Sequence, residues 1–207
     1  MRMDTDMFKK GINTLKSDSG AVTLEAAGVF VCMIMLIFFV FDLSKLILNK
    51  GKVERVAHSI ASIVRERTYL YNSQNLLTRQ DVEDMADVAK RLLGDTFPGK
   101  NVAIQIETLY FDNANKNSAT IDDTMSVSYS TLFSSVSSCK AAGNTLKNTP
   151  ELKNMTFWSE RSSWGWVPVY RVTVCVERDD FSGFSRFVGQ MINMPASITI
   201  SNVVMPR

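Results

Sequence analysis

One carboxylate stands where a negative charge is costly. Glu25 ends the stretch Ser-Gly-Ala-Val-Thr-Leu-Glu at residues 19–25, and a long apolar run follows it directly. A charged carboxylate at the edge of hydrocarbon calls for a partner. The simplest interpretation is that Glu25 only marks the interfacial start of an anchor helix. The alternative is that Glu25 neutralises a positive charge at the head of that helix.

Cysteine thiols offer a second kind of chemistry. Cys32 lies inside the apolar run and is most simply a small buried hydrophobe. Cys139 and Cys175 lie in the later, more polar part, without CxxC spacing or a neighbouring histidine that would indicate a metal site. In an oxidising compartment these two can pair and close a loop of about 36 residues, worth roughly 3–4.5 kcal/mol. The alternative is two unrelated buried thiols.

Residues able to do catalysis are isolated from one another. His58 is the single histidine, and Ser137 with Lys140 forms a bare SxxK pattern that lacks its companion motifs. No HExxH, GxSxG, GxGxxG or phosphate-loop pattern occurs. The sequence therefore predicts no catalytic residue, no metal and no cofactor, and the protein is not expected to be an enzyme.

The charged side chains in the rest of the sequence are expected to be solvated rather than to form a binding site. The formal net charge is only +2, from 23 basic and 21 acidic residues, which gives no basis for binding nucleic acid. Acidic pairs such as Asp122–Asp123 are expected to be solvated. A calcium site at Asp112, Asp122 and Asp123 is the less favoured alternative, because no EF-hand loop supports it.

Two features each leave two interpretations open. Arg65, Glu66 and Arg67 form either a solvated helix end, in which Arg and Glu satisfy each other, or a clamp for carboxylates of a partner subunit. A group of three tryptophans either packs a loop onto a small core, which we favour, or forms a binding surface: Trp158, Trp164 and Trp166.

The apolar run predicts a membrane span. Residues 26–41 contain no charged or strongly polar side chain, and sixteen residues of helix reach about 24 Å. Continuing to residue 48 reaches the roughly 30 Å of a hydrocarbon core, with Lys45 free to extend to the interface. An ordinary secretory signal fits less well, because residues 1–20 are polar and no small-x-small cleavage site follows the run.

The spacing of Gly20 and Glu25 resembles the processing site of type IV prepilins and pseudopilins, in which a peptidase cuts after the glycine. Two further stretches, ERVAHSIASIVRERTYLY (54–71) and DVEDMADVAKRLLG (81–94), resemble the TadF-type minor pseudopilins of tight-adherence (Tad/Flp) pilus systems. The resemblance implies cleavage between Gly20 and Ala21 by a prepilin peptidase. The freed Ala21 amine would lie one helical turn from Glu25, so that Glu25 of one subunit could neutralise the amine of its neighbour.

The same resemblance implies a location in the cell, an orientation in the membrane and a set of partners. The N-terminus would be cytoplasmic, the helix would span the bacterial inner membrane, and the C-terminal domain would be periplasmic, with entry into the pilus left open. The partners would be the lipid bilayer, the prepilin peptidase, a TadE-like pseudopilin, the major pilin and the inner-membrane assembly platform. Its function would be pilus biogenesis, and hence adherence and biofilm formation. The alternatives are a minor pseudopilin of a type II secretion system and an uncleaved signal-anchored periplasmic enzyme or sensor.

The surrounding elements predict an α+β fold with a small, mainly antiparallel sheet packed on the long N-terminal helix. The helical spacing of apolar residues predicts that this helix continues to about residue 70. Gly51 is the position within it at which the helix is expected to be least stable. A second helix is expected from Thr78 to Gly94, with Asp81 in a capping box. Its expected buried face is Val82, Met85, Ala89, Leu92 and Leu93.

The second half of the chain predicts the sheet. Strands are expected at 102–106, 125–129, 167–177 and 197–204, a polar loop at 112–123, mostly irregular chain at 131–166, and a short helix with Phe184, Phe187, Val188 and Met191. The chain is thus divided into a leader at 1–20, a transmembrane helix at 21–48, a periplasmic helical region at 49–94 and a periplasmic α+β domain at 95–207.

Overall fold

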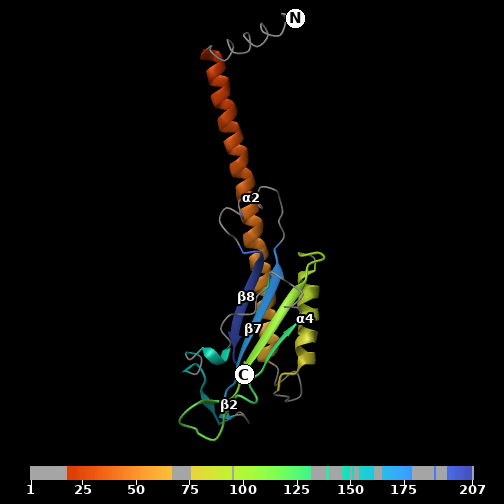
Figure 1. Cartoon of the computed structure of the whole chain (residues 1–207), viewed down its shortest axis with the longest axis vertical. Coiled ribbons are helices and arrows are strands. Elements are labelled where there is room, and N and C mark those ends of the chain that lie inside the picture. Colours follow the sequence, from red (N-terminus) through yellow and green to blue (C-terminus); the bar gives the residue numbers. More distant parts are fainter. Residues whose placement is uncertain are drawn as a thin grey trace, which may run out of the picture.

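The computed structural model describes residues 18–66, 76–94, 96–131, 139, 146–149, 151, 154–160, 165–178, 189 and 195–206. Its elements, labelled as in Figure 1, are two long helices, four strands of one sheet, two short hairpins and a 3-10 turn. The α+β class predicted from the sequence is confirmed.

The first helix, α2, is Asp18–Arg65, a continuous helix of 48 residues that reaches about 72 Å. It passes through Gly51 without a break. Its last residue is Arg65, and Glu66 follows in a turn. The predicted end near residue 70 lies outside the described residues. Figure 1 shows its first half projecting beyond the rest of the molecule and its second half lying along the sheet.

The second helix, α4 (Arg79–Leu93), begins as predicted. The Thr78 hydroxyl accepts the N–H of Asp81, and the Asp81 carboxylate accepts the N–H of Thr78, so two otherwise unpaired donors are satisfied. Four of the five residues expected on its buried face are buried. Leu92 is not: it is 54% exposed, and Ala86 takes part in the core instead.

The sheet contains four antiparallel strands in the order β4-β1-β7-β8. Their bounds are β1 Val102–Leu109, β4 Ser128–Thr131, β7 Val169–Glu177 and β8 Ser197–Val204. The strand expected at 125–129 therefore lies slightly later in the chain. The expected polar loop contains a small hairpin, β2 (Phe111–Asp112) with β3 (Thr120–Ile121), and a second joins β5 (Trp158–Ser159) to β6 (Gly165–Trp166). The helix expected around Phe184 lies outside the described residues.

The main core lies between one face of the sheet and the two helices. The strands contribute alternate residues, among them Ile104, Ile106, Val172 and Val174. The second half of α2 contributes six residues at helical spacing: Val53, Val56, Ala57, Ile60, Ala61 and Val64. Each fully buried valine or isoleucine is worth roughly 1.5–3 kcal/mol, so this half of α2 is an integral part of the domain. Over this stretch, the apolar residues whose helical spacing predicted the continuation of the helix pack against the protein's own domain.

Candidate functional site: the exposed head of the long helix

The first half of α2 is apolar on every side and packs against nothing among the described residues. Every residue from 22 to 41 is exposed, and its large apolar side chains are 39–69% exposed. Within the described residues, α2 is the one helix long and apolar enough to cross a membrane. Twenty residues of helix reach about 30 Å, the thickness of a hydrocarbon core. Exposing such an apolar surface to water costs free energy, whereas exposing it to lipid does not.

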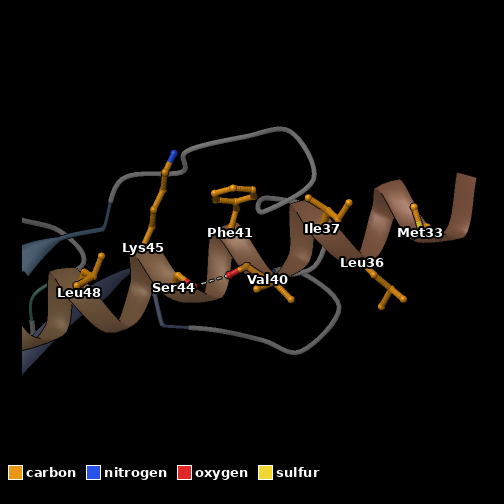
Figure 2. A pocket seen from close by; sticks show the side chains of 8 residues that line it. All are labelled: Met33, Leu36, Ile37, Val40, Phe41, Ser44, Lys45 and Leu48. Atoms are coloured by element: carbon orange, nitrogen blue, oxygen red, sulfur yellow. Dashed lines mark hydrogen bonds between the residues drawn. The ribbon is translucent and has the colours of Figure 1, made fainter. Parts of the chain in front are cut away.

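The apolar surface continues almost to the domain. Figure 2 shows Ile37, Phe41 and Lys45 on one side of α2, and Leu36 and Val40 on another. Ser44 does not leave its hydroxyl unpaired, because the hydroxyl donates to the carbonyl of Val40 at 2.8 Å. Around Ser44, α2 therefore presents apolar side chains and a hydroxyl paired within the helix, beside the charged amine of Lys45.

The predicted processing residues lie at the head of this segment. Gly20 and Ala21 fall in the first turn of α2, and Glu25 lies on the same helix, exposed, where the apolar surface begins. Residues four apart on a helix lie on the same face, so Glu25 stands above the backbone of Ala21. Cleavage after Gly20 stays a prediction, as does the pairing of Glu25 with an amine of another subunit.

The predicted partner-contact residues are only partly described. The Nη2 of Arg65 lies 3.2 Å from Oε1 of Glu66, and its Nε donates to the same oxygen. These two charges therefore satisfy each other at the end of α2. Arg67 lies outside the described residues, and contact of these residues with a partner subunit stays a prediction.

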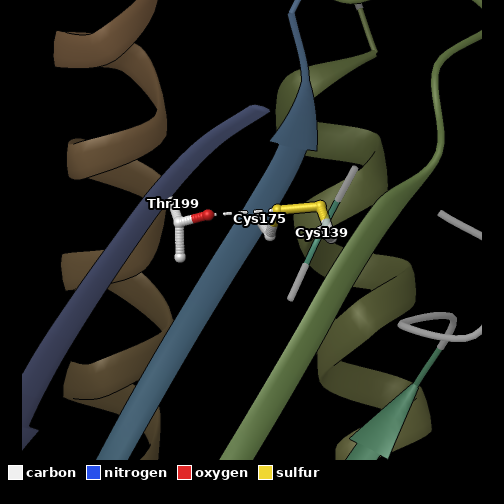
Figure 3. Close-up of a disulfide and its surroundings, with 3 residues drawn as sticks. All are labelled: Cys139, Cys175 and Thr199. Atoms are coloured by element: carbon white, nitrogen blue, oxygen red, sulfur yellow. Dashed lines mark hydrogen bonds between the residues drawn. A yellow bond between two sulfur atoms is a disulfide. The ribbon is translucent and has the colours of Figure 1, made fainter. Parts of the chain in front are cut away.

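A disulfide joins Cys139 to Cys175, with the two Cα atoms 6.0 Å apart. Figure 3 shows Cys175 on β7, between Cys139 and Thr199 of β8. The Thr199 hydroxyl donates to the Cys175 sulfur at 3.2 Å. Cys175 points to the face of the sheet opposite the helices, so the bond holds the segment that contains Cys139 against that face. Cys32 is a free, exposed cysteine within the apolar half of α2.

A buried ion pair on the same outer face was missed by sequence reasoning. Glu107 of β1 is 2% exposed, and its Oε2 accepts from Nε of Arg171 on β7 at 2.5 Å. Its Oε1 accepts the backbone N–H of Leu146 at 3.2 Å. Leu146 belongs to the 3-10 turn η1 (Leu146–Asn148) and is itself buried. Glu107 thus ties a separate segment of the chain to the sheet.

Two of the three tryptophans pack against each other across a short hairpin. Trp158 and Trp166 are cross-strand partners in the β5–β6 hairpin, with ring centroids 5.7 Å apart in an edge-to-face arrangement. The indole N–H of Trp166 donates to the carbonyl of Asn115, so the hairpin is packed onto the β2–β3 loop. The described contacts support the packing role for these two rings. Trp164 lies outside the described residues.

The weaker chemical candidates have ordinary roles where they are described. The pKa of Asp122 is held below its usual value, mainly because the Thr124 hydroxyl donates to it, with a further bond from the N–H of Met125. These bonds cap a turn. His58 is exposed on α2, while Ser137 and Lys140 lie outside the described residues. Within the part of the chain that the structure describes, no three His, Cys, Asp or Glu side chains come together as metal ligands.

Comparison with known proteins gives one result. A family model named TadF, described as "Putative tight adherence pilin protein F", matches residues 13–206, which is nearly the whole chain. Neither a curated protein nor a solved structure gives a significant match. The matched range includes the exposed head of α2, the disulfide and the buried ion pair.

Proposed function

Because the chain belongs to the TadF family of tight adherence pilin proteins, we propose that it is a minor pseudopilin, a membrane-anchored assembly component of a tight-adherence pilus. The family consists of structural pilus components rather than enzymes. The family match favours this system over the type II secretion alternative. No catalytic constellation among the described residues favours the alternative of an anchored enzyme or sensor.

The observation that carries the proposal is the exposed apolar head of α2. An isolated chain gains nothing from about 30 Å of unburied apolar helix that bears a carboxylate at its start. A helix packed among similar helices inside a membrane gains both van der Waals contact and a partner for that carboxylate. Association through this segment is therefore the activity that the geometry supports best.

Each part of the chain has a cellular compartment under this proposal. Residues 1–20 are a cytoplasmic leader removed after Gly20, residues 21–48 span the inner membrane, and residues 49–207 form the periplasmic part. The partners are the prepilin peptidase, a TadE-like pseudopilin, the major pilin and the inner-membrane assembly platform. Through them the protein supports pilus biogenesis, adherence and biofilm formation.

We expect replacement of Glu25 with alanine to impair pilus assembly without preventing membrane insertion. Loss of the carboxylate leaves the neighbouring α-amine unpaired inside the membrane, whereas the apolar helix is retained. The measurement is the number of pili and the surface adherence of cells that carry the variant in place of the native gene. Membrane fractionation of the same cells reports insertion.

A matched control is available on the same helix. Glu54 is also an exposed carboxylate of α2, but it lies beyond the apolar half. Glu54→Ala is expected to leave piliation unchanged. Normal piliation in the Glu25→Ala strain would contradict the proposed pairing.

A further inference from the structure

The strand β8 forms one edge of the main sheet. Among the described residues it pairs with β7 alone, in an unbroken register from Ser197 to Val204. It contains neither proline nor a charged residue. Sheet edges are commonly protected by prolines, lysines, bulges or short strands. The opposite edge, β4, is only four residues long, so β8 is the edge that lacks all of these features.

One hydrogen bond shows which backbone groups of β8 point outward. The N–H of Arg178 donates to the carbonyl of Ala196 at 2.9 Å, in the same register as the β7–β8 pairs. In an antiparallel ladder, such hydrogen-bonded pairs alternate with pairs that share no hydrogen bond. Counted from Ala196, the residues without a bond to β7 are Thr199, Ser201 and Val203. Their backbone N–H and C=O groups therefore point away from β7.

The side chains of β8 indicate that the space beside it is open. Those of Thr199, Ser201 and Val203 are exposed. On the other face, Ile200 and Val204 pack against the core but are only partly buried, whereas the valines of β7 on that face are completely buried. A further strand beyond β8 would cover these apolar side chains and bond the outward backbone groups.

Twofold pairing of two copies through β8 is incompatible with anchoring in one membrane. Figure 1 shows β8 and the second half of α2 both lying along the long axis of the molecule. Antiparallel pairing of two β8 strands requires a twofold axis perpendicular to them, which would point the two apolar segments in opposite directions. A twofold axis along the strands would place equivalent side chains on opposite faces at the same height, which breaks the pleat.

Head-to-tail pairing of two copies meets a different obstacle. The edge strand β4 of a second copy could continue the antiparallel sheet beyond β8. Neighbouring strands are rotated by about 20–25°. Four such steps would turn the second copy by roughly 80–100°, so its α2 could not cross the same membrane in the same direction.

We propose that β8 binds an extended segment of a different polypeptide of the pilus assembly, which joins the sheet as a further strand. Hydrogen bonds to Thr199, Ser201 and Val203 supply affinity, and apolar side chains at alternate positions of the segment cover Ile200 and Val204. The choice of a different polypeptide rests on the membrane anchoring proposed above, whereas the open edge does not. The proposal adds a specific contact surface to the association role of the protein.

The test is hydrogen–deuterium exchange resolved to single amides. It compares the full-length protein purified in detergent with the same protein in inner-membrane vesicles from piliated cells. In detergent the amides of Thr199, Ser201 and Val203 are expected to exchange fast, and those of Ile200 and Asn202, which donate to β7, slowly. In the vesicles the three outward amides should exchange on the order of tenfold more slowly, because each then donates to the added strand.

Paired proline variants test the position of the contact. Ser201→Pro removes an outward N–H and no bond to β7, so it should abolish the protection of the other two outward amides in the vesicles. Ser130→Pro on β4 is the matched control. The N–H of Thr108 donates to the carbonyl of Val127 at 2.8 Å, so the same alternation points the Ser130 N–H away from β1. This variant should keep the protection, and unchanged exchange of β7 amides in both variants shows that the fold is intact.

Three results would overturn the added strand itself. Equal exchange of the outward amides in detergent and in vesicles, with the protein inserted, leaves the proposed function standing without a strand at β8. Slow exchange already in detergent would show that the edge is not open. Loss of protection in both proline variants would contradict a contact placed at β8.

Two further results would overturn the identity of the occupant. Protection in liposomes that contain this protein alone would assign the edge to a second copy. Absence of the protein from the membrane vesicles would overturn the anchoring, and with it the exclusion of a second copy.

Discussion

Replacing Glu107 with leucine is expected to lower the free energy of unfolding by about 3–5 kcal/mol, because it leaves a mostly buried guanidinium without its carboxylate. The side chain of Arg171 is only 12% exposed, and Glu107 accepts hydrogen bonds from it through Nε and Nη2. The same substitution removes the acceptor for the N–H of Leu146, which is also buried. The measurement is urea unfolding of the full-length protein in detergent micelles, followed by tryptophan fluorescence.

A second variant separates the ion pair from mere packing. Glu107→Leu combined with Arg171→Met removes both charges and should recover part of the lost stability, because no unpaired charge then remains buried. Recovery should be incomplete, since an unsatisfied buried N–H costs about 1–3 kcal/mol. Glu160→Gln, which breaks the exposed pair with Lys116, should change little. A Glu107→Leu protein as stable as the native one would contradict this account of the outer face.

Loss of the disulfide is the second large effect. Replacing Cys139 and Cys175 with alanine should cost about 3–4 kcal/mol, because the bond closes a loop with a sequence separation of 36 residues. The loss should be concentrated on the outer face of the sheet, since the bond holds the Cys139 segment over Ala103 and Cys175. Urea unfolding gives the total, and hydrogen exchange of β7 amides gives the location.

The third cysteine supplies the control for this experiment. Cys32 is a free cysteine in the exposed half of α2. Cys32→Ala is expected to leave the unfolding curve unchanged, with and without reductant. The native protein should lose stability in reductant to the same extent as the double variant, and insensitivity to reductant would contradict a stabilising disulfide.

The elements with a strong local signal could be predicted from sequence. The start of α4 follows from Thr78 and Asp81, which satisfy each other's backbone donors without help from the rest of the chain. The strand β8 was predicted with its observed bounds, Ser197–Val204. In β7 the valines Val172, Val174 and Val176 recur at every second residue, as in a strand with one buried face, and they lie on the face that contacts the helices.

The outer face of the sheet shows why other features could not be predicted. The polar residues that alternate with the apolar ones in β1 indicate a solvated face, yet Gln105 is 6% exposed and Glu107 is 2% exposed. Leu146, 39 residues later in the chain, donates its backbone N–H to Glu107, and Gln105 donates to Ser128 of the neighbouring strand. Alternation within one strand carries no information about either contact. One signal was present: Cys175 lies on this face, so its pairing with Cys139 requires covering chain there.

Two smaller differences between the predicted and the observed structure have similar causes. Leu92 fits the helical spacing of the α4 core, but the sheet and α2 cover a narrower face that contains Ala86 instead. The hairpin of β2 and β3 lies in a segment rich in Asp and Asn, whose composition is typical of an irregular loop. In the candidate site, composition alone predicted the apolar span. The structure was needed to show that the first half of α2 is exposed whereas the second half is part of the core.

The most direct test of the central claim is the intact mass of the protein purified from its native membrane, beside that of a Gly20→Ala variant. We expect the native protein to begin at Ala21 and to gain the mass of two hydrogens on reduction, whereas the variant keeps its leader. Such a result would establish the protein as a processed pilin-like subunit with an oxidised domain outside the cytoplasm. Native and variant chains that both begin at Met1 would contradict the account and leave a plain membrane anchor.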